Sequence, residues 1–389
     1  MQKTYKYRLY PSKAQEVKLT AALEVCRVLY NSCLLDRKNY FESTGKGLSR
    51  IRQQEILTAD KKRVLLLNEV HSQVLQDVLF RIERAYKGFF RRLAEKQGKA
   101  GYPRLKNEGR YDSITYPQEP GFKIEAGKLR LSKIGQIKMR MHRDIVGQVK
   151  TCTIRRDGNH WYACFSVGYE PEKRLIPDKA VGIDVGLKSF AVLSNGTEIA
   201  NPRYLRKTEK KLKQTQRSLS QKKKGGSNRR KTRQIVTSLH RKVRNQRLDF
   251  HHKESRKIVN SFGLIAVEDL KIGNMMQNHH LSKSITDAGW GGFLNILASK
   301  AEEAGCRFEK VDPRNTSVRC SRCGESVPKT LAVRIHQCPL CGLVLDRDHN
   351  AALNILQRAT AGTAESYAWG EVAHSGPSLN QEAMSLAAW

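Results

Sequence analysis

Four cysteines near the C-terminal end of the chain have the spacing of a zinc site. They form two Cys-x-x-Cys pairs, each followed by glycine, with 14 residues between the pairs: Cys320, Cys323, Cys338 and Cys341. Each pair places two thiolates on one side of a tight turn, and two such turns complete a tetrahedral four-cysteine site. Because four protein ligands leave no position for water, the zinc should be structural. The alternative is a site in which His336 replaces one cysteine.

Acidic residues supply a second kind of chemistry. Asp184 ends the apolar run of "VGIDVG", Glu268 ends that of "IAVED", and Asp346 and Asp348 lie between "LVL" and the helix-forming run "NAALNIL". Acids at the ends of different strands of one sheet can converge, and they repel one another unless a divalent cation lies between them. Hard oxygen ligands suit Mg²⁺ or Mn²⁺. Two such ions can activate water and stabilise the leaving oxygen of a phosphodiester.

These acids have other interpretations. A single aspartate at the end of a strand is often only a cap or turn residue, and the residues alone do not decide between Asp346 and Asp348. The motif "GIDVG" also suits sugar kinases and actin-like ATPases, but the sequence lacks the further Gly-rich phosphate loops that those enzymes need. The charge of the whole chain favours phosphodiester chemistry.

That charge is strongly positive. The 389 residues include 71 Lys and Arg against 37 Asp and Glu, for a formal net charge of +34, while 39% are hydrophobic. The chain is thus long and apolar enough to fold as two or three domains. An excess of this size calls for a polyanion, and nucleic acid is the first choice. A solvated basic surface is the alternative.

Much of the excess lies in one segment. Residues 203–257 hold 21 Lys and Arg against three acids. Leucines seven apart (205, 212 and 219) and apolar residues four apart (235, 239 and 243) predict two amphipathic helices joined by the flexible "KKKGGSN". This basic helical hairpin, which we place at 203–261, would lay a positive stripe along a phosphate backbone.

The first half of the chain predicts a mixed domain. A strand ends at Pro11, and helices follow over 13–95. The clearest helix has an apolar stripe of residues four apart: Val70, Val74, Val78, Ile82, Tyr86 and Phe90. From 110 to 170 the period changes to short alternating strands, with a hairpin turn at Asp157-Gly158. Basic side chains on such strands suggest a small β-barrel with a nucleic-acid face. Cys26 and Cys33 are expected to be buried thiols of the helical core.

The second half alternates strands and helices, as an α/β fold does. Strands are predicted over 180–200 and 264–269, a helix over 286–304, and another strand at "CRFEKV". The last stretch, 361–389, has no Lys or Arg and is rich in small residues, so we expect a disordered tail there.

The sequence also predicts a location. It shows no signal peptide and no apolar run of membrane-spanning length, so no membrane partner is expected. Nine cysteines in such a chain suggest a reducing compartment. We expect a cytoplasmic, nucleoid-associated protein of a prokaryote.

At these motifs the chain resembles the TnpB (OrfB) family of transposon-associated RNA-guided DNA endonucleases and their relatives, the compact type V CRISPR effectors. The matching stretches lie between residues 5 and 356: "YKYRLYPSKAQ", "GYPRLK", "GIDVGLKSFAVLSNG", "VEDLKIGNM", "CSRCG" and "HQCPLCGLVLDRDHNAALNIL". The resemblance implies an α+β multidomain protein. Its parts would be a β-barrel wedge domain with a helical insert and a RuvC-like, ribonuclease H-type nuclease domain with α/β fold that carries an inserted zinc ribbon.

The resemblance also implies boundaries. The wedge domain would comprise 1–12 and 101–175, with the helical recognition insert at 13–100. The RuvC-like domain would span 176–315 and end with 346–360, the zinc ribbon would occupy 316–345, and "LVL" would return the chain to the nuclease sheet.

The site residues follow from the same resemblance. The family's catalytic and magnesium-binding triad maps to Asp184, Glu268 and Asp348, which leaves Asp346 as a structural or cap residue. Arg334 matches a basic position of the family and is a candidate contact for the scissile phosphate. The other candidate nucleic-acid contacts lie in the hairpin and in "GYPRLK": Arg229, Arg230, Lys231, Tyr102 and Arg104.

The expected activity is Mg²⁺- or Mn²⁺-dependent cleavage of double-stranded DNA beside a short motif, directed by a guide RNA from the transposon end. The protein would act as a monomer bound to that RNA, with pairing supplying the sequence specificity. The alternatives are a nuclease-inactive RNA-guided regulator, a transposase that joins strands, and a type V CRISPR effector.

Overall fold

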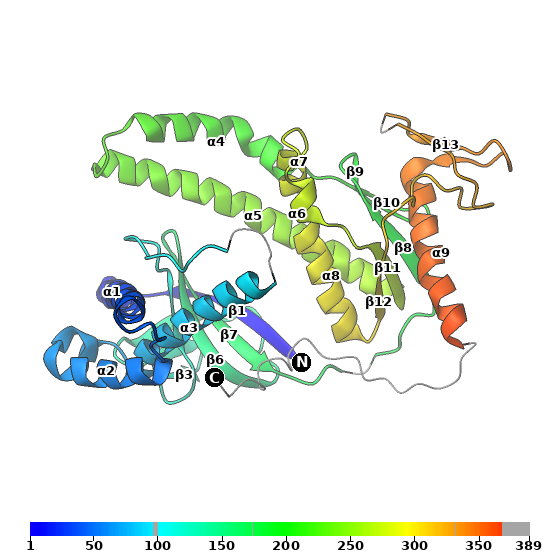
Figure 1. Ribbon diagram of the computed structural model, residues 1–389. Coiled ribbons are helices and arrows are strands. Elements are labelled where there is room, and N and C mark those ends of the chain that lie inside the picture. The colour runs from blue at the N-terminus through cyan, green and yellow to red at the C-terminus, as the bar shows by residue number, and fades with distance from the viewer. Residues whose placement is uncertain (96–99, 173, 331, 368–389) are drawn as a thin grey trace. The chain divides into compact units, whose positions relative to one another are not determined.

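The computed structural model describes residues 1–95, 100–172, 174–330 and 332–367 (Figure 1). The chain forms two compact units, Met1–Pro171 and Glu172–Trp389. Within the described residues, no helix combines the length and the apolar character needed to cross a membrane.

The first unit is built on a seven-stranded antiparallel sheet with the order β2-β6-β7-β1-β5-β4-β3. The strands are β1 (Gln2–Tyr10), β2 (Ser113–Tyr116), β3 (Phe122–Glu125), β4 (Lys128–Leu131), β5 (Gly135–Arg140), β6 (Gln148–Asp157) and β7 (His160–Gly168). Alternate residues of β1 (Tyr5, Tyr7 and Leu9) are buried, as the period-two pattern requires. In the described residues β2 and β3 do not pair with each other, so the ladder of the expected barrel is not closed.

Helices cover part of this unit: α1 (Lys13–Thr44), α2 (Arg50–Arg63), the short 3-10 helix η1 (Leu65–Glu69) and α3 (Ser72–Ala94). The predicted apolar stripe of α3 is confirmed at Val74, Val78 and Ile82, which are buried, but it is wrong at Phe90, which is exposed near the end of the helix. Cys26 and Cys33 are also buried, and burial raises the pKa of each thiol to about 12. They are therefore core side chains, as expected.

The second unit contains a five-stranded sheet with the order β10-β9-β8-β11-β12. The strands are β8 (Ala180–Val185), β9 (Ser189–Leu193), β10 (Glu198–Ala200), β11 (Leu264–Glu268) and β12 (Arg307–Val311). Strands β8, β11 and β12 are mutually parallel, whereas β9 and β10 are antiparallel to their neighbours. The carboxyl ends of β8 and β11 therefore lie side by side at one edge.

The basic segment forms the predicted helical hairpin, α4 (Tyr204–Gln221) and α5 (Ser227–Ser261) (Figure 1). Leu212 and Val243 are buried between the helices. The expected apolar stripe on α5 is wrong at Ile235, which is half exposed, while Thr232, three residues earlier, is buried instead. The Thr232 hydroxyl accepts a hydrogen bond from Lys222, which explains how a polar residue fits there.

The helix expected over 286–304 is also interrupted. Short helices α6 (Ile272–Met275) and α7 (Ser282–Ala288) precede α8 (Trp290–Ala304), and Gly289 between α7 and α8 has φ +69°. A side chain there would meet Arg247 Cδ at 2.9 Å and His251 Cε1 at 3.2 Å. Glycine therefore both ends α7 and lets α5 approach closely.

The last helix, α9 (Arg347–Tyr367), packs on β8 (Figure 1). It includes residues 361–367, so the expectation of disorder from 361 is wrong for those seven residues, and the remaining tail, 368–389, lies outside the described residues. The strand expected at "LVL" forms as β14 (Val344–Asp346), but it pairs with β13 (Ile335–Gln337) in a separate two-stranded sheet. Helix α9, and not this strand, returns the chain to the five-stranded sheet.

Gly182 permits that packing. A Cβ at this position would lie 2.1 Å from Ala352 O and 2.7 Å from Leu356 N, both backbone atoms of α9. We therefore expect Gly182→Ala to push α9 away from β8 and to lower the free energy of unfolding by about 1–3 kcal/mol, as measured by urea denaturation. Gly47→Ala is the control, because a Cβ there meets nothing within 4 Å. Equal stability of the two variants would contradict the packing described.

Candidate functional site

Three carboxylates from separate elements meet at one edge of the five-stranded sheet. Asp184 and Glu268 follow the paired residues Ile183 and Val267 of the parallel strands β8 and β11, so their side chains lie at adjacent strand ends. Asp348 lies in the first turn of α9, the helix that crosses β8. The structure thus places Glu268 and Asp348 close enough to Asp184 for their charges to affect it, and the assignment of the three acids as a catalytic set stays a prediction.

Their electrostatics reflect that closeness. Burial, followed by the charges of Glu268 and Asp348, raises the pKa of Asp184 well above its usual range. Burial also raises the pKa of Glu268, and a hydrogen bond donated by the Thr316 hydroxyl at 2.5 Å partly opposes the increase. Burial and then the charge of Asp346 raise the pKa of Asp348. Three carboxylates that disfavour ionisation in one place form a site that would gain from a cation.

Asp346 has a different environment from Asp348. Its Oδ1 accepts hydrogen bonds from the backbone N–H groups of Asp348, at 2.8 Å, and His349, at 3.3 Å. These are N–H groups of the first helical turn, which have no partner inside the helix. Asp346 therefore caps α9, a role that the residues alone could not distinguish from that of a metal ligand.

Cations lie next to Asp348. Arg334 Nη1 is 3.7 Å from Asp348 Oδ1, and the Arg334 side chain remains 49% exposed. The charges of Arg334, Arg347 and Lys188 all lower the pKa of Asp348, against the effect of burial. Arg347 also ties the helix start to the preceding segment, since its backbone N–H donates to Arg334 O at 2.7 Å.

The four cysteines form a second cluster. All four Sγ atoms lie within 4.8 Å of one another, with Cys320 and Cys341 3.6 Å apart and Cys323 and Cys338 3.5 Å apart. A zinc ion about 2.3 Å from each sulfur of a tetrahedron needs about 3.8 Å between sulfurs. Within the described residues, this is the one group of three or more His, Cys, Asp or Glu side chains whose ligand atoms lie close enough together to hold a metal ion. The cluster fits structural zinc.

The thiols themselves favour a cation. Burial opposes ionisation of Cys320, but backbone N–H groups of Cys323 and Arg322 outweigh it and lower the pKa to about 6. A backbone N–H at Glu325 favours the Cys323 thiolate, yet burial and the neighbouring sulfurs raise its pKa to about 12. One thiolate thus forms readily and a second next to it does not. A dication would remove that repulsion.

Two asparagines of α9 that the sequence did not single out form hydrogen bonds to the segment that carries the four cysteines (316–345, the zinc-bearing segment). Asn350 Nδ2 donates to Arg319 O at 2.7 Å and its Oδ1 accepts from Ser321 N at 2.9 Å. Asn354 Nδ2 donates to Thr316 O and Arg319 O, at 2.8 and 2.7 Å. Both side chains are buried. Their spacing of four residues on a helix was the available signal, because buried asparagines must find backbone partners.

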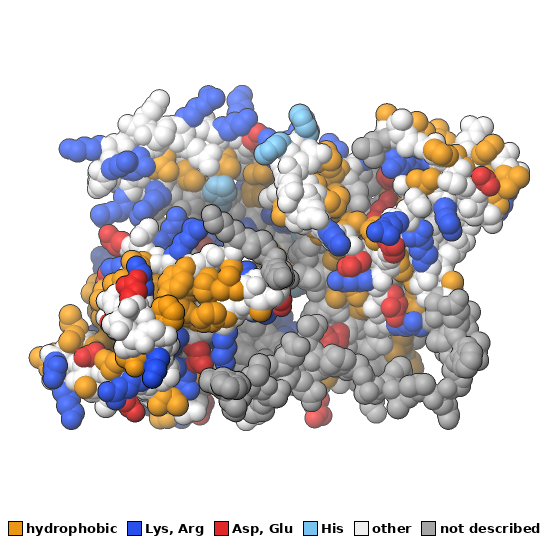
Figure 2. All heavy atoms as spheres, in the orientation of Figure 1, with side chains coloured by type: hydrophobic (Ala, Val, Ile, Leu, Met, Phe, Trp, Pro, Cys, Tyr) orange, Lys and Arg blue, Asp and Glu red, His pale blue; other side chains and the backbone are white. Residues whose placement is uncertain are grey.

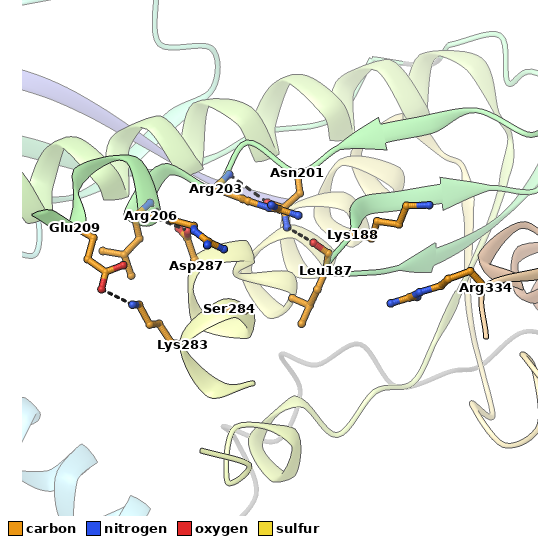
Figure 3. Close-up of a pocket in the computed structure, with 11 residues that line it drawn as sticks. Leu187, Lys188, Asn201, Arg203, Arg206, Glu209, Lys283, Ser284, Asp287 and Arg334 are labelled. Carbon is orange, nitrogen blue, oxygen red and sulfur yellow. Dashed lines mark hydrogen bonds and ion pairs between the residues drawn. The ribbon is translucent and has the colours of Figure 1, made fainter. Parts of the chain in front are cut away.

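A cleft of about 550 Å³ is lined by residues from β8–β9, α4, α7 and the zinc-bearing segment (Figure 3). Its cationic lining residues are Lys188, Arg203, Arg206, Lys283 and Arg334. Lys188 and Arg334, whose charges lower the pKa of Asp348, lie at the same side of the cleft, and Arg334 extends toward Leu187 in Figure 3. Asp184, Glu268 and Asp348 do not line this cleft, and its connection to Asp348 is through Arg334 and Lys188.

Asp287, also in this cleft, anchors the hairpin. Helix α4 has no side-chain cap of its own, and Asp287 of α7 instead accepts from Leu205 N at 2.9 Å and Arg206 N at 3.4 Å. Arg247 of α5 donates to the same carboxylate at 3.3 Å. One largely buried acid thus fixes both hairpin helices, and sequence reasoning gave no sign of it.

The remaining candidate contacts differ in their surroundings. Lys and Arg side chains gather along the hairpin in Figure 2. Arg230 and Lys231 are exposed there, but the Arg229 guanidinium donates to Leu219 O and Lys222 O and so closes the turn between α4 and α5.

In the first unit, Arg104 is exposed, whereas the Tyr102 hydroxyl shares a hydrogen bond with the Tyr86 hydroxyl and its ring packs edge-on against Phe89. The nucleic-acid contacts stay predictions.

Comparison with known families defines the class of the protein. Residues 164–279 match the family OrfB_IS605, described as "Probable transposase". Residues 290–355 match "Cas12f1-like, TNB domain", and residues 1–46 match "Helix-turn-helix domain". In the structure residues 1–46 form β1 and α1, while the TNB match contains all four cysteines.

Curated relatives extend the likeness along the chain. It is 31% identical to "Putative RNA-guided DNA endonuclease InsQ" of Escherichia coli K12, over 97% of this chain and 96% of that one. It is also 31% identical to "Putative RNA-guided DNA endonuclease" of Streptomyces pristinaespiralis, over 94% and 91%. Against "CRISPR-associated endodeoxyribonuclease Cas12f1" of Sulfoacidibacillus thermotolerans it is 30% identical over 51% and 50%. The chain belongs to the TnpB/OrfB family of RNA-guided DNA endonucleases, which is related to Cas12f.

The position of Asp348 should depend on the zinc cluster, because the zinc-bearing segment is hydrogen-bonded to α9 through Asn350 and Asn354. We expect Cys338→Ser with Cys341→Ser to abolish zinc binding and reduce DNA cleavage at least tenfold through displacement of Asp348. Zinc content by elemental analysis and a cleavage assay measure the two effects. Cys164→Ser, on β7 of the other unit, is the control. Full cleavage by the zinc-free variant would show that the cluster does not position the acid.

Proposed function

We propose that the protein is an RNA-guided endonuclease that cleaves double-stranded DNA beside a short motif, with Asp184, Glu268 and Asp348 as its catalytic acids. The observation that carries this proposal is the meeting of the three carboxylates at one sheet edge, where burial and mutual repulsion raise the pKa of Asp184. Full-length similarity to proteins named RNA-guided DNA endonucleases supports it.

The fold of the second unit supports a RuvC-like, ribonuclease H-type domain. Numbered along the unit, its strands have the order 3-2-1-4-5, with the first, fourth and fifth parallel. In this sheet Asp184 is the last residue but one of the central strand, and Glu268 is the last residue of the strand beside it. We assign 176–315 and 346–360 to this domain and 316–345 to the zinc ribbon. In the first unit, the sheet would be the wedge domain (1–12 and 101–175), and 13–100 its helical insert.

The donor set fits Mg²⁺ or Mn²⁺. Carboxylate oxygens are the ligands that these hard cations prefer, and a cation between Asp184, Glu268 and Asp348 would relieve the repulsion that disfavours their ionisation. Bound there, it would activate water and stabilise the leaving oxygen of the phosphodiester. Thr316 orients Glu268 by its hydrogen bond. Asp346 orients the first turn of α9 and so aims Asp348.

The cleft would receive the strand to be cut. Arg334 and Lys188, beside Asp348, are placed to hold the scissile phosphate and its neighbour. Arg203 and Arg206, farther along the cleft, would contact the phosphates that follow (Figure 3). Phosphate contacts of this kind fix position and carry no sequence information, which suits an enzyme that takes its specificity from a guide.

Guide RNA would be the principal partner. The hairpin presents Arg230 and Lys231 to solvent beside many other basic residues, and a single-sign surface of this length is stabilised by a polyanion. Pairing between the RNA and one DNA strand would supply specificity, while the protein reads backbone shape and the adjacent motif.

The two aspartates at the start of α9 give a matched test of the site. Asp348→Asn and Asp184→Asn should each lower cleavage of guide-matched DNA by on the order of 10³-fold or more while guide RNA remains bound. Asp346→Asn should cleave nearly as well as the parent, because asparagine caps a helix as well as aspartate does. Cleavage assays with Mg²⁺ and RNA co-purification measure both effects. Active Asp348→Asn together with inactive Asp346→Asn would reverse the assignment.

Binding should depend steeply on salt, because each phosphate interaction releases counterions. With roughly six to ten such interactions, RNA affinity should fall by about 10³–10⁵-fold between about 50 and 200 mM salt. Replacing Arg230 and Lys231 by glutamine should lower the slope of log affinity against log salt by roughly one for each phosphate interaction removed. Filter binding at several salt concentrations measures this. A flat dependence in the parent protein would remove the argument from charge.

A further inference from the structure

His336 is buried beside the cysteine cluster. It lies on β13, opposite Leu345 of β14, and its side chain has no exposed surface. The next knuckle begins two residues later at Cys338. A histidine buried completely in so small a sheet needs partners for both ring nitrogens, since an unsatisfied polar group there costs about 1–3 kcal/mol.

Lys329 determines which nitrogen carries the proton. Its ammonium group contacts His336 Nδ1. A lysine ammonium has three donors and no acceptor, so Nδ1 must accept and the hydrogen of the neutral ring must lie on Nε2. Nε2 is therefore a buried donor.

That donor lies close to the sulfur of Cys320. The His336 side chain lies within interaction distance of the Cys320 thiol. In the described structure, however, Nε2 has no partner with full hydrogen-bond geometry. The His336 Nε2–H group therefore lies near the Cys320 sulfur, which is a weak acceptor while it is a thiol. A zinc-bound thiolate is a much stronger acceptor.

We propose that Lys329 and His336 form a relay that supports the zinc site from outside its four ligands, with His336 Nε2–H donating to the Cys320 sulfur. Four thiolates around Zn²⁺ carry a net charge of about −2. The N–H group disperses part of that charge, and the ammonium group of Lys329 balances another part through the imidazole. Outer partners of this kind orient metal ligands and raise affinity. The proposal concerns the metal centre and does not depend on the nuclease activity.

The test is zinc affinity of the full-length protein, measured by competition with a chromogenic chelator. His336→Phe keeps the ring volume without nitrogen and should lower affinity about 10- to 100-fold. His336→Gln keeps one acceptor and one donor and should retain most of the affinity. Lys329→Met should weaken binding in the same direction as His336→Phe. His280→Gln, at an exposed position, and Lys271→Met, on the surface of the same unit, are the controls.

Replacement of zinc by Co²⁺ distinguishes a supporting histidine from a ligand. The visible absorption of Co²⁺ reports its ligand set, so His336→Gln should leave the spectrum of a four-thiolate site unchanged. A changed spectrum would make His336 a ligand and overturn the proposal. Unchanged zinc affinity in either His336→Phe or Lys329→Met would also overturn it. If His336→Phe fails to fold, Lys329→Met and His336→Gln still decide, because equal affinity in Lys329→Met and the parent contradicts the relay.

Discussion

The repulsion that Glu268 and Asp348 exert on the buried Asp184 is the constraint on which the proposed site depends. Carboxylates that are partly buried together favour separation or protonation, and the pKa of Asp184 rises because of both its burial and its neighbours' charges. The surrounding frame must therefore hold them in place at a cost in stability. Strained or repulsive groups persist where the rest of a structure over-determines their positions, and two of the three acids come from the rigid ends of adjacent parallel strands.

The position of the third acid, Asp348, depends on several contacts in turn. Asp348 is held because α9 lies directly on β8 at Gly182, where no Cβ intervenes. Asp346 caps the start of α9. Asn350 and Asn354, on the buried face of the helix, donate hydrogen bonds to the zinc-bearing segment. The cysteine cluster closes that segment on itself. Zinc in the cysteine cluster would thus be a structural support of the proposed carboxylate site and would take no part in its chemistry.

Local patterns in the sequence were sufficient for much of this architecture. The period of four in α3, the alternation in β1 and the Asp-Gly turn between β6 and β7 each reflect interactions within a short stretch. The Cys-x-x-Cys pairs and the strand-end acids were visible for the same reason. The role of Asp346 as the cap of α9 was not visible locally, because it depends on which carboxylate accepts hydrogen bonds from the helix N–H groups.

The features that sequence reasoning missed arise from contacts between distant segments. Gly289 ends a helix where α5 lies against it, and on α5 Thr232 is buried while Ile235 is exposed. Asp287 caps a helix 82 positions away in the chain. The two-stranded pairing of β13 and β14 likewise could not be inferred from the short apolar run "LVL", which suits either sheet.

Crystallisation of the protein with Mn²⁺, followed by anomalous diffraction, tests most directly whether the three carboxylates form one cation site. The account predicts an anomalous peak at the carboxyl edge of β8 and β11, coordinated by oxygens of Asp184, Glu268 and Asp348, with Asp346 still bonded to the backbone of α9. A peak coordinated by Asp346 in place of Asp348, or no peak at this edge under saturating Mn²⁺, would contradict it.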